Sequence, residues 1–425
     1  MEHDQPIYKS NKNMKNLSSL GKIKKAQKII QIFKQKGFEA FIVGGAVRDY
    51  LLNIPFNQDV DITTNAVPQD INAIFQSQKR AYYGCIKIIF EEESFEITTY
   101  REEDIYLNHR HPNKIVFIQE VKKDVIRRDF TINALLMDEK GQIFDWTEGK
   151  SDLTKKILRT IQNPFISFEK DALRIMRAFY FQAKLNFQIE KQTQIALTKH
   201  SHLLTQISSS RIYEYLQKII TYPHWQASFK MMIETKAHLF LKPITKAIIF
   251  FASLKDEEFT NKNLEENIFW SIAFVFNKNI FSLFPINSKK KKQCQTLIIL
   301  SNHIFTNLKL NLFTHQLSNC LLAYKINYLL SPQKSKIFLI ENLDNIKQTY
   351  KNLPLKNFQE LKMDWRQIAP HRIPEIKQKV IQAVLEKKIT NELEELKAFV
   401  FNHKHNEKVD AWHKKEKKRK KYDKQ

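Results

Sequence analysis

Glycine is scarce in this chain and confined to one end of it. Only seven of the 425 residues are glycine, and none follows Gly149. Because glycine is the usual residue of tight turns and strained backbone, a long stretch without it argues against turn-rich β-structure. The 275 residues after position 150 are instead dominated by Lys, Leu, Ile, Gln and Glu. We therefore expect them to be mostly helical.

Cysteine and long apolar runs are also scarce. Cys85, Cys294 and Cys320 lie far apart and form no Cys-x-x-Cys pair, which predicts a reducing compartment and no structural zinc site. The first 20 residues are polar, and the longest apolar runs, such as residues 247–252, are too short to span a bilayer. We expect a cytoplasmic protein that does not contact a membrane.

Acidic residues are outnumbered by basic ones. The chain has 69 Lys and Arg against 45 Asp and Glu, a net charge of +24. Such a charge favours a polyanionic partner, nucleic acid above all, although a basic proteome or a solubility adaptation would have the same composition. Residues 413–425 alone carry eight Lys or Arg against two acids, which is typical of a disordered basic tail.

The first 150 residues have the patterns that the rest of the chain lacks. Apolar residues recur at helix spacing from Ile23 to Phe33, and Gly37 is the expected stop. Five short runs rich in β-branched and aromatic residues predict strands. These runs are EAFIVGG, DVDITT, IKIIF, SFEITTY and KIVFI. The pattern indicates an N-terminal α/β domain joined to a helical remainder.

Two aspartates close the segment FIVGGAVRDYLLNIPFNQDVDITT, residues 41–64. Because strand residues alternate between faces, Asp59 and Asp61 are expected on one face, with Cα atoms about 7 Å apart. Val60 then points into the core. Two carboxylates on one face can hold a pair of divalent ions about 4 Å apart. Mg²⁺ is usually held in this way, by one or two carboxylates together with substrate phosphates.

A glycine turn and an arginine precede these aspartates. Gly44 and Gly45 end a strand and would let the backbone approach a triphosphate, and the N–H groups of the following helix favour anions. Arg48, on the first turn of that helix, can reach phosphate oxygens. Each feature alone is common at turns, caps and surfaces. Their ordered combination predicts a nucleotidyl-transfer site, in which one ion activates a hydroxyl and the other stabilises the leaving pyrophosphate.

The pattern VGGAVRD followed by DVDITT resembles the catalytic signature of the class II tRNA nucleotidyltransferase and bacterial poly(A) polymerase family. Four further segments resemble motifs of that family in the same order, and residues 380–396 are similar to the tail of Gram-positive CCA-adding enzymes. The four segments are RRDFTINAL (127–135), DWTEGKSDLTKKILRTI (145–161), KDALRIMRAFYF (170–181) and SRIYEYLQKII (210–220).

The resemblance implies roles for five more residues. Arg128 would contact the bound nucleotide, with Asp129 at its ribose. Asp171 and Arg174, expected on one helix face, would template the base: Asp171 accepts from the amino group of cytosine or adenine, and Arg174 donates to the adjacent ring nitrogen. Guanine and uracil would lose both contacts, at about 1–3 kcal/mol each. Arg177 would continue this face towards the base or the phosphates.

Other interpretations of these residues remain open at this point. Arg128 and Asp129 would also suit an exposed charged turn. Asp171 and Arg174 would also suit an ordinary intrahelical ion pair. Glu96, on a neighbouring strand, is a candidate third metal ligand, and a solvent-facing residue is the alternative. The chain departs from the family pattern at five positions, namely Asn108, His111, Lys170, Tyr180 and Ser210.

The fold that these observations predict is an α+β nucleotidyltransferase head, a small mixed sheet with helices, followed by all-α neck, body and tail domains. The expected boundaries are 1–20 for a polar N-terminal segment, 21–150 for the head, 151–225 for the neck with its base-reading motif, 226–330 for the body, 331–403 for the tail and 404–425 for the basic, disordered end.

The function that the resemblance implies is addition of C, C and A to tRNA 3′ ends from CTP and ATP, with Mg²⁺ as cofactor. Alternatives are a poly(A) polymerase, an enzyme that adds only the final A, and a non-catalytic tRNA-binding protein. Residues 96–117 resemble the loop of CCA enzymes, and the basic Arg-Phe-Arg-Leu segment of bacterial poly(A) polymerases is absent around residues 79–90. Intact Arg48, Asp59 and Asp61 argue against a non-catalytic protein. A homodimer stays open.

Overall fold

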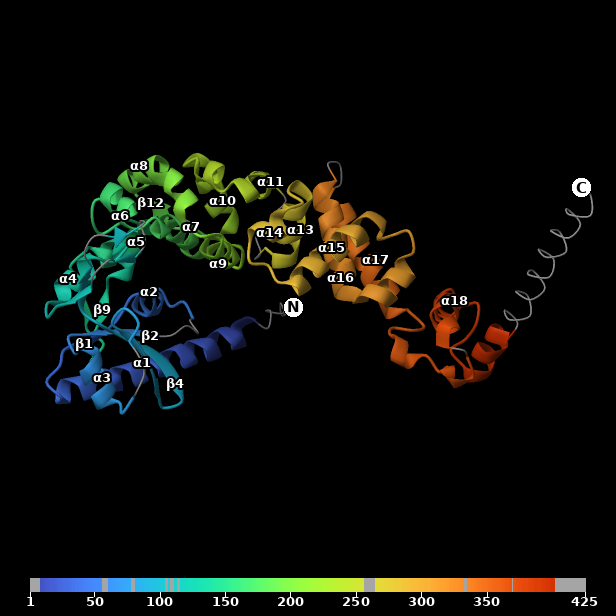
Figure 1. Cartoon of the computed structure of the whole chain (residues 1–425), viewed down its shortest axis with the longest axis horizontal. Coiled ribbons are helices and arrows are strands. Elements are labelled where there is room, and N and C mark those ends of the chain that lie inside the picture. Colours follow the sequence, from blue (N-terminus) through green and yellow to red (C-terminus); the bar gives the residue numbers. More distant parts are fainter. Residues whose placement is uncertain are drawn as a thin grey trace, which may run out of the picture. The chain divides into compact units, whose positions relative to one another are not determined.

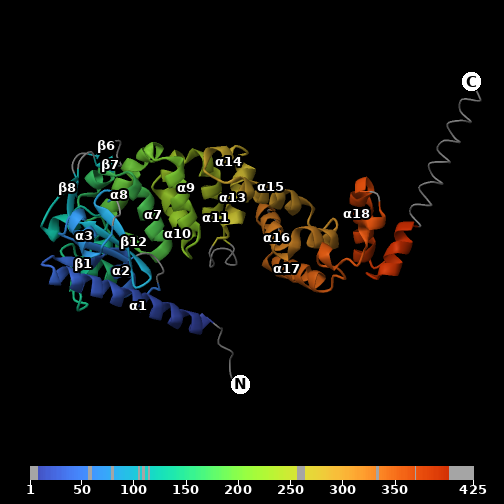
Figure 2. The same cartoon turned by 60° about the horizontal axis from the view of Figure 1, so that its bottom comes forward.

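The chain divides into two compact units (Figures 1 and 2). The first consists of residues 1–265 and 282–285, and the second of residues 266–281 and 286–425. The computed structural model describes residues 8–55, 60–77, 81–103, 106–107, 111–112, 115–255, 264–331, 335–368 and 370–401. Within these ranges every strand belongs to the first unit, and the second unit is built from helices.

A six-stranded mixed sheet forms the core of the head, in the order β10-β9-β1-β2-β4-β3. The strands are β1 (Ala40–Val43), β2 (Val60–Thr64), β3 (Cys85–Phe90), β4 (Glu93–Thr99), β9 (Leu136–Met137) and β10 (Ile143–Phe144). Only β2 and β4 run parallel among these neighbours. The predicted small mixed sheet is confirmed, and Val60 is fully buried as expected.

Two strand pairs lie outside this sheet on the same segment of the chain. Antiparallel β5 (Arg101–Glu103) and β8 (Ile115–Phe117) form one, and β6 (Tyr106–Leu107) and β7 (His111–Pro112) form the other. The predicted strand KIVFI is therefore present as β8, although it pairs with β5 instead of joining the main sheet.

The long helix α1 (Tyr8–Gln35) packs against β1 and β2, beside α2 (Gly45–Leu51) and near α3 (Pro68–Ile74) (Figure 1). Its apolar residues Ile23 to Phe33 are buried, which confirms the predicted helix face. The helix begins at Tyr8, so part of the polar N-terminal segment is helical. Gly37 (φ 83°) closes it: the Gly37 N–H donates to the Lys34 carbonyl, and the Phe38 N–H to that of Phe33.

The rest of the first unit is helical, as expected, with one exception. Its helices are α4 (Val121–Ile126), α5 (Gly149–Lys155), α6 (Pro164–Lys170), α7 (Leu173–Leu185), α8 (Lys191–His200), α9 (Ser209–Ile220), α10 (Trp225–Glu234) and α11 (Thr245–Ser253). Helix α7 packs against α9 and α10. The exception is a short parallel pair, β11 (Ile157–Leu158) with β12 (Gln188–Ile189), which the expectation of helix after residue 150 did not include.

The second unit contains helices that pack against one another. They are α13 (Glu266–Phe276), α15 (Ser288–His303), α16 (Leu308–Leu330), α17 (Lys336–Lys351) and α18 (Ile373–Leu385), and α14 (Ile280–Leu283) falls at the division between the units. Helix α16 is in contact with α13, α15, α17 and α18. Lys387 (φ 60°) closes α18 with the hydrogen bonds that Gly37 makes after α1. In the described part of the chain, no helix is both long and apolar enough to cross a membrane.

Candidate active site

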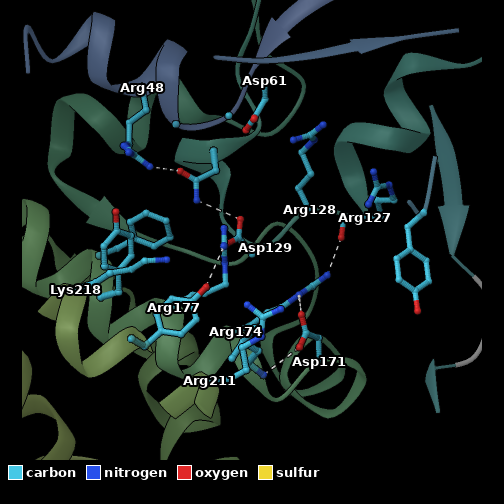
Figure 3. Close-up of a pocket in the computed structure, with 18 of the residues that line it drawn as sticks. Arg48, Asp61, Arg127, Arg128, Asp129, Asp171, Arg174, Arg177, Arg211 and Lys218 are labelled. Atoms are coloured by element: carbon cyan, nitrogen blue, oxygen red, sulfur yellow. Dashed lines mark hydrogen bonds and ion pairs between the residues drawn. The ribbon is translucent and has the colours of Figure 1, made fainter. Parts of the chain in front are cut away.

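A pocket of about 800 Å³ in the first unit brings most of the predicted site residues together (Figure 3). The predicted residues that line it are Gly44, Gly45, Arg48, Asp61, Arg128, Asp129, Asp171, Arg174 and Arg177. Its charged lining has eight cations and three carboxylates. Such an excess of positive charge suits a polyanionic ligand. Asp59 lies outside the described residues, and Glu96 is not part of the lining.

The turn after β1 leaves open space beside the carboxylate of Asp61. Val43 pairs with Asp61 across β1 and β2, so Gly44 follows directly beside that aspartate. Gly44 has φ 79°, in the region that favours glycine. A Cβ at this position would lie 3.6 Å from Asp61 Oδ2 and 3.9 Å from Arg128 Nη1. Glycine therefore keeps a side chain out of the gap between the predicted metal ligand and the predicted nucleotide contact.

Asp61 can contribute one carboxylate ligand to a divalent cation in this space. Asp61 is half-buried. Carboxylate oxygens are the hard ligands that Mg²⁺ prefers. Glu96 is the register partner of Asp61 across β2 and β4, but it is partly exposed and lies 3.9 Å from Lys87 Nζ. Asp59 falls outside the described residues. Among those that are described, no group of three or more His, Cys, Asp or Glu could hold a metal ion.

Arg48 is held in a buried ion network between the head and the neck. Only 2% of the residue is exposed. Its Nε donates to Asp49 Oδ1 at 2.9 Å and its Nη1 to Asn133 Oδ1 at 2.5 Å, and its guanidinium lies 5.0 Å from the centre of the Phe181 ring. Lys184, on α7, donates to the other Asp49 oxygen at 2.7 Å. Two cations from two elements thus neutralise one aspartate.

Asp124 orients the two arginines of the Arg-Arg-Asp motif. This fully buried carboxylate on α4 accepts from Arg127 at 2.6 Å and from Arg128 at 3.0 Å. Burial alone would raise the pKa of Asp124, but the charges of Arg128 and Arg127 outweigh it and lower that pKa to about 2. The Nε of Arg128 is buried and has no hydrogen-bond partner among the described residues. Asp124 therefore orients Arg128, while the Nε–H donor of Arg128 is not used by any described residue.

Asp129 and Arg177 form a second enclosed pair. Asp129 Oδ2 accepts from Arg177 Nε at 2.5 Å, and its Oδ1 accepts from the Phe130 N–H and the Asn133 side chain. Burial opposes ionisation of Asp129, yet Arg177 outweighs it and holds the pKa of this carboxyl below its usual range. Burial likewise opposes the charge on Arg177, and Asp129 outweighs it and raises that pKa.

Asp171 and Arg174 lie close together, but the prediction that they share one helix face is wrong for Asp171. Its backbone is extended (φ −137°, ψ 97°) between α6 and α7, and its Oδ1 accepts from the Leu173 N–H at 3.0 Å. Arg174 Nε lies 3.8 Å from Asp171 Oδ2, and its other nitrogens donate to Ser167 Oγ and the Arg127 carbonyl. Burial raises the pKa of Asp171, against the opposing effect of Arg174.

Several lining residues were missed by the sequence prediction. Arg211, Tyr215 and Lys218 come from α9 and recur at helix spacing i, i+4 and i+7, so they share a face. That spacing, within a segment already matched to the family, was the available signal. Tyr82 and Tyr83 also line the pocket, and nothing in their spacing pointed to it.

Comparisons with protein families match both parts of this unit. A model described as "Poly A polymerase head domain" matches residues 40–159, and one described as "Probable RNA and SrmB- binding site of polymerase A" matches residues 186–249. The CCA-adding enzyme of Streptococcus uberis is 30% identical over 411 residues, which cover 93% of this chain and 100% of that protein. The CCA-adding enzyme of Streptococcus pyogenes is 40% identical over 230 residues, covering 54% and 57%.

Solved structures share the fold. The Bacillus stearothermophilus CCA-adding enzyme in complex with CTP superposes with a TM-score of 0.76 at 24% identity, over 92% of this chain and 99% of that one. The Thermotoga maritima CCA-adding enzyme complexed with tRNA-CCA superposes with a TM-score of 0.59 at 18% identity, over 89% and 94%. The predicted head followed by helical domains is therefore confirmed at the level of the fold.

Proposed function

The chain belongs to the family of CCA-adding enzymes, and we propose that it adds C, C and A to the 3′ end of tRNA, with CTP and ATP as substrates and Mg²⁺ as cofactor. It is a nucleotidyltransferase. One observation carries the proposal. A single basic pocket joins the space beside Gly44 and Asp61 to the Asp171–Arg174 pair, so groups suited to the triphosphate and to the base line the same cavity.

The triphosphate is assigned to the glycine turn and the cations around it. Arg128 Nη1 borders the space beside Gly44, and its buried Nε has a hydrogen-bonding capacity that no described residue uses. A phosphate oxygen would satisfy that donor by a charge-assisted hydrogen bond. Arg48, fixed by Asp49 and Asn133, contributes positive charge from a rigid position. Preorganised charge of this kind needs no rearrangement when the reaction begins.

Asp61 and Asp59 would hold the magnesium ions in this proposal. Bound there, Mg²⁺ supplies activation of the primer hydroxyl and stabilisation of the departing pyrophosphate. Gly44 keeps the approach to the Asp61 carboxylate free of a side chain. The cations of the pocket then offset the remaining charge of the polyphosphate.

Base selection is assigned to Asp171 and Arg174. Asp171 would accept from the amino group of cytosine or adenine, and Arg174 would donate to the neighbouring ring nitrogen. Arg174 is held by Ser167 Oγ at 2.7 Å and the Arg127 carbonyl at 2.8 Å, which use two of its five N–H donors. Held this way, the guanidinium keeps one orientation through successive additions.

The decisive experiment follows the ends of tRNA. The protein is incubated with Mg²⁺, labelled CTP or ATP, and tRNA that lacks CCA, lacks only the final A, or is complete, and the product ends are sequenced. The proposal expects two C and one A on the first substrate, one A on the second and nothing on the third. Runs of A would indicate a poly(A) polymerase, and activity on the second substrate alone would indicate an A-adding enzyme. Asp61→Ala protein prepared in parallel controls for contaminating activity.

A further inference from the structure

Two exposed tyrosines line the pocket. Tyr82 is 74% exposed and Tyr83 37%, and their ring centroids lie 4.6 Å apart at an interplanar angle of 83°. Both belong to the pocket lining, together with arginines. Large aromatic side chains are usually more buried than Tyr82. Packing of the fold does not account for its position.

The backbone that carries these rings is strained. The N–H groups of Tyr82 and Cys85 each donate to the other residue's carbonyl at 3.0 Å, and the two residues between them have positive φ, 50° at Tyr83 and 75° at Gly84. This is the type I′ geometry, which favours Asn, Asp or Gly at the position that Tyr83 occupies. A bulky residue at positive φ is a steric outlier, and such outliers cluster at functional sites.

Contacts with Arg101 and Phe117 hold this turn in place. The guanidinium of Arg101 donates to the Tyr83 carbonyl through Nη1. Gly84 has positive φ, and a Cβ there would lie 2.8 Å from the Phe117 ring, so any other residue would be strained and would have to displace that ring. Arg101 lines the pocket as well. The structure therefore offers two aromatic faces on a supported turn, with a cation beside them.

We infer that Tyr82 and Tyr83 form a stacking platform for the last bases of the RNA primer, an inference that rests on the proposed function. The groups assigned to the incoming nucleotide, such as Asp129 and Arg174, are buried, whereas Tyr82 is open to solvent, from which the RNA end must enter. Stacking on an aromatic ring with nearby cations binds any base. That tolerance suits a primer whose last base changes as nucleotides are added.

Steady-state kinetics test the platform. Replacing Tyr82 by alanine should raise KM for tRNA by roughly ten- to a hundredfold, the range of one lost stacking interaction, while KM for CTP and ATP changes by less than about twofold. Tyr82→Phe, which keeps the ring, should stay near the wild type. Tyr50→Ala is the matched control, because Tyr50 is a 39% exposed tyrosine outside the pocket lining. A higher KM for CTP or ATP in place of tRNA would overturn the inference.

A double-mutant cycle makes the test specific to the base. A primer whose last residue is abasic should lose affinity for the wild type, and Tyr82→Ala should cause little further loss on it. Independent, additive losses would show that Tyr82 does not stack on that base. If the proposed function is wrong, the wild type itself does not build C, C and A on the tRNA end. If only the platform is wrong, the wild type is active and the cycle shows no coupling.

Tyr83 gives a test in which stability and binding should move in opposite directions. Tyr83→Asn places Asn-Gly, a favoured type I′ pair, in the turn and should raise the thermal midpoint. The same change removes a ring and should weaken RNA binding, measured directly by titration with tRNA. A gain in stability with unchanged RNA affinity would exclude Tyr83 from the platform.

Discussion

The first unit encloses some of its ion pairs and leaves others exposed, whereas the described pairs of the second unit are all at least partly exposed. Asp49 with Lys184, and Asp124 with Arg127 and Arg128, are buried or nearly so. In the second unit Lys347 and Asp344 form a pair of similar length, 2.9 Å, yet their side chains are 54% and 60% exposed. The same interaction thus has two very different surroundings in one chain.

Enclosed and exposed ion pairs differ in their energetic cost. Removing two charges from water costs several kcal/mol per ion, which good geometry offsets only in part. An exposed pair contributes about 0–1 kcal/mol and is screened by salt. The enclosed pairs are therefore the costly ones to form, and one of their carboxylates, Asp124, holds two arginines that line the pocket, Arg127 and Arg128.

The largest effect is expected from removing the carboxylate that is assigned to the metal. Asp61→Ala should lower kcat for both C and A addition on the order of 10³-fold or more, because the lost charge stabilisation amounts to several kcal/mol, while tRNA still binds. The same loss is expected for Asp59→Ala. Asp344→Ala removes a carboxylate from the second unit and should leave kcat unchanged. Normal turnover by the Asp61 variant would contradict the metal assignment.

The next largest effect concerns stability. Asp124→Asn leaves Arg127 and Arg128 without their buried counter-charge and should reduce the free energy of unfolding by about 3–5 kcal/mol. Asp344→Asn, the matched change on an exposed pair, should alter it by no more than about 0.5 kcal/mol. Urea titrations of both variants give the values. Equal effects at the two sites would remove the distinction between enclosed and exposed pairs.

The pH dependence of unfolding provides a second test of Asp124. The pKa of Asp124 is about 2 in the folded protein, below its ordinary value of 3.8, so its ionised form favours the fold. This contribution, on the order of 2 kcal/mol, is complete above pH about 4 and declines as pH falls towards 2. Unfolding measured from pH 5 downwards should therefore be less pH-dependent in Asp124→Asn than in the wild type. Parallel curves would mean that Asp124 titrates normally.

A smaller effect is expected for base selection. Asp171→Ala removes one acceptor and should relax discrimination against UTP and GTP by roughly 5- to 150-fold, the equivalent of about 1–3 kcal/mol. Triphosphate binding should change less, because Arg128 and the glycine turn remain. Competition between nucleotides measures the ratio of kcat/KM values. If selectivity stayed the same and only stability fell, the residue would be a helix cap with an ion pair.

The smallest expected effect compares two helix ends of the same geometry. Gly37 after α1 and Lys387 after α18 both have positive φ and close their helices with equivalent hydrogen bonds. Gly37→Ala should destabilise by about 1 kcal/mol, because a Cβ disfavours this conformation. Lys387→Gly should stabilise by up to about 1 kcal/mol for the converse reason. Thermal unfolding of both variants checks the signs, and a loss on Lys387→Gly would show that its side chain matters more than its backbone.

Much of the head could be predicted from local patterns. Alternation and glycine placement located β1 to β4, the turn at Gly44 and the half-buried Asp61. The pair β11 and β12 was missed because strands of two residues are too short to show an alternating pattern. Asp171 was placed on a helix because its spacing to Arg174 fits one, whereas its side chain hydrogen-bonds locally to the Leu173 N–H, which ends helical geometry.

The rest of the pocket depends on contacts that no local pattern records. Asp124 precedes the two arginines by three and four residues, a spacing that also describes any exposed helical pair. Its complete burial arises from the sheet around it, which includes Thr63. Tyr82 and Arg211 reach one cavity from positions far apart in the chain. Such proximity is a property of the fold.

The buried lysine on α7 has a consequence for chemical labelling. Lys184 Nζ is bound to Asp49 at 2.7 Å and lies 5.8 Å from the centre of the Tyr222 ring, so an amine-reactive reagent cannot reach it while α2 and α7 stay together. Exposed lysines such as Lys347 are modified without any such opening. The rate at which Lys184 is acylated, followed by mass spectrometry, therefore reports how often the head separates from the neck, in a protein that carries no added probe.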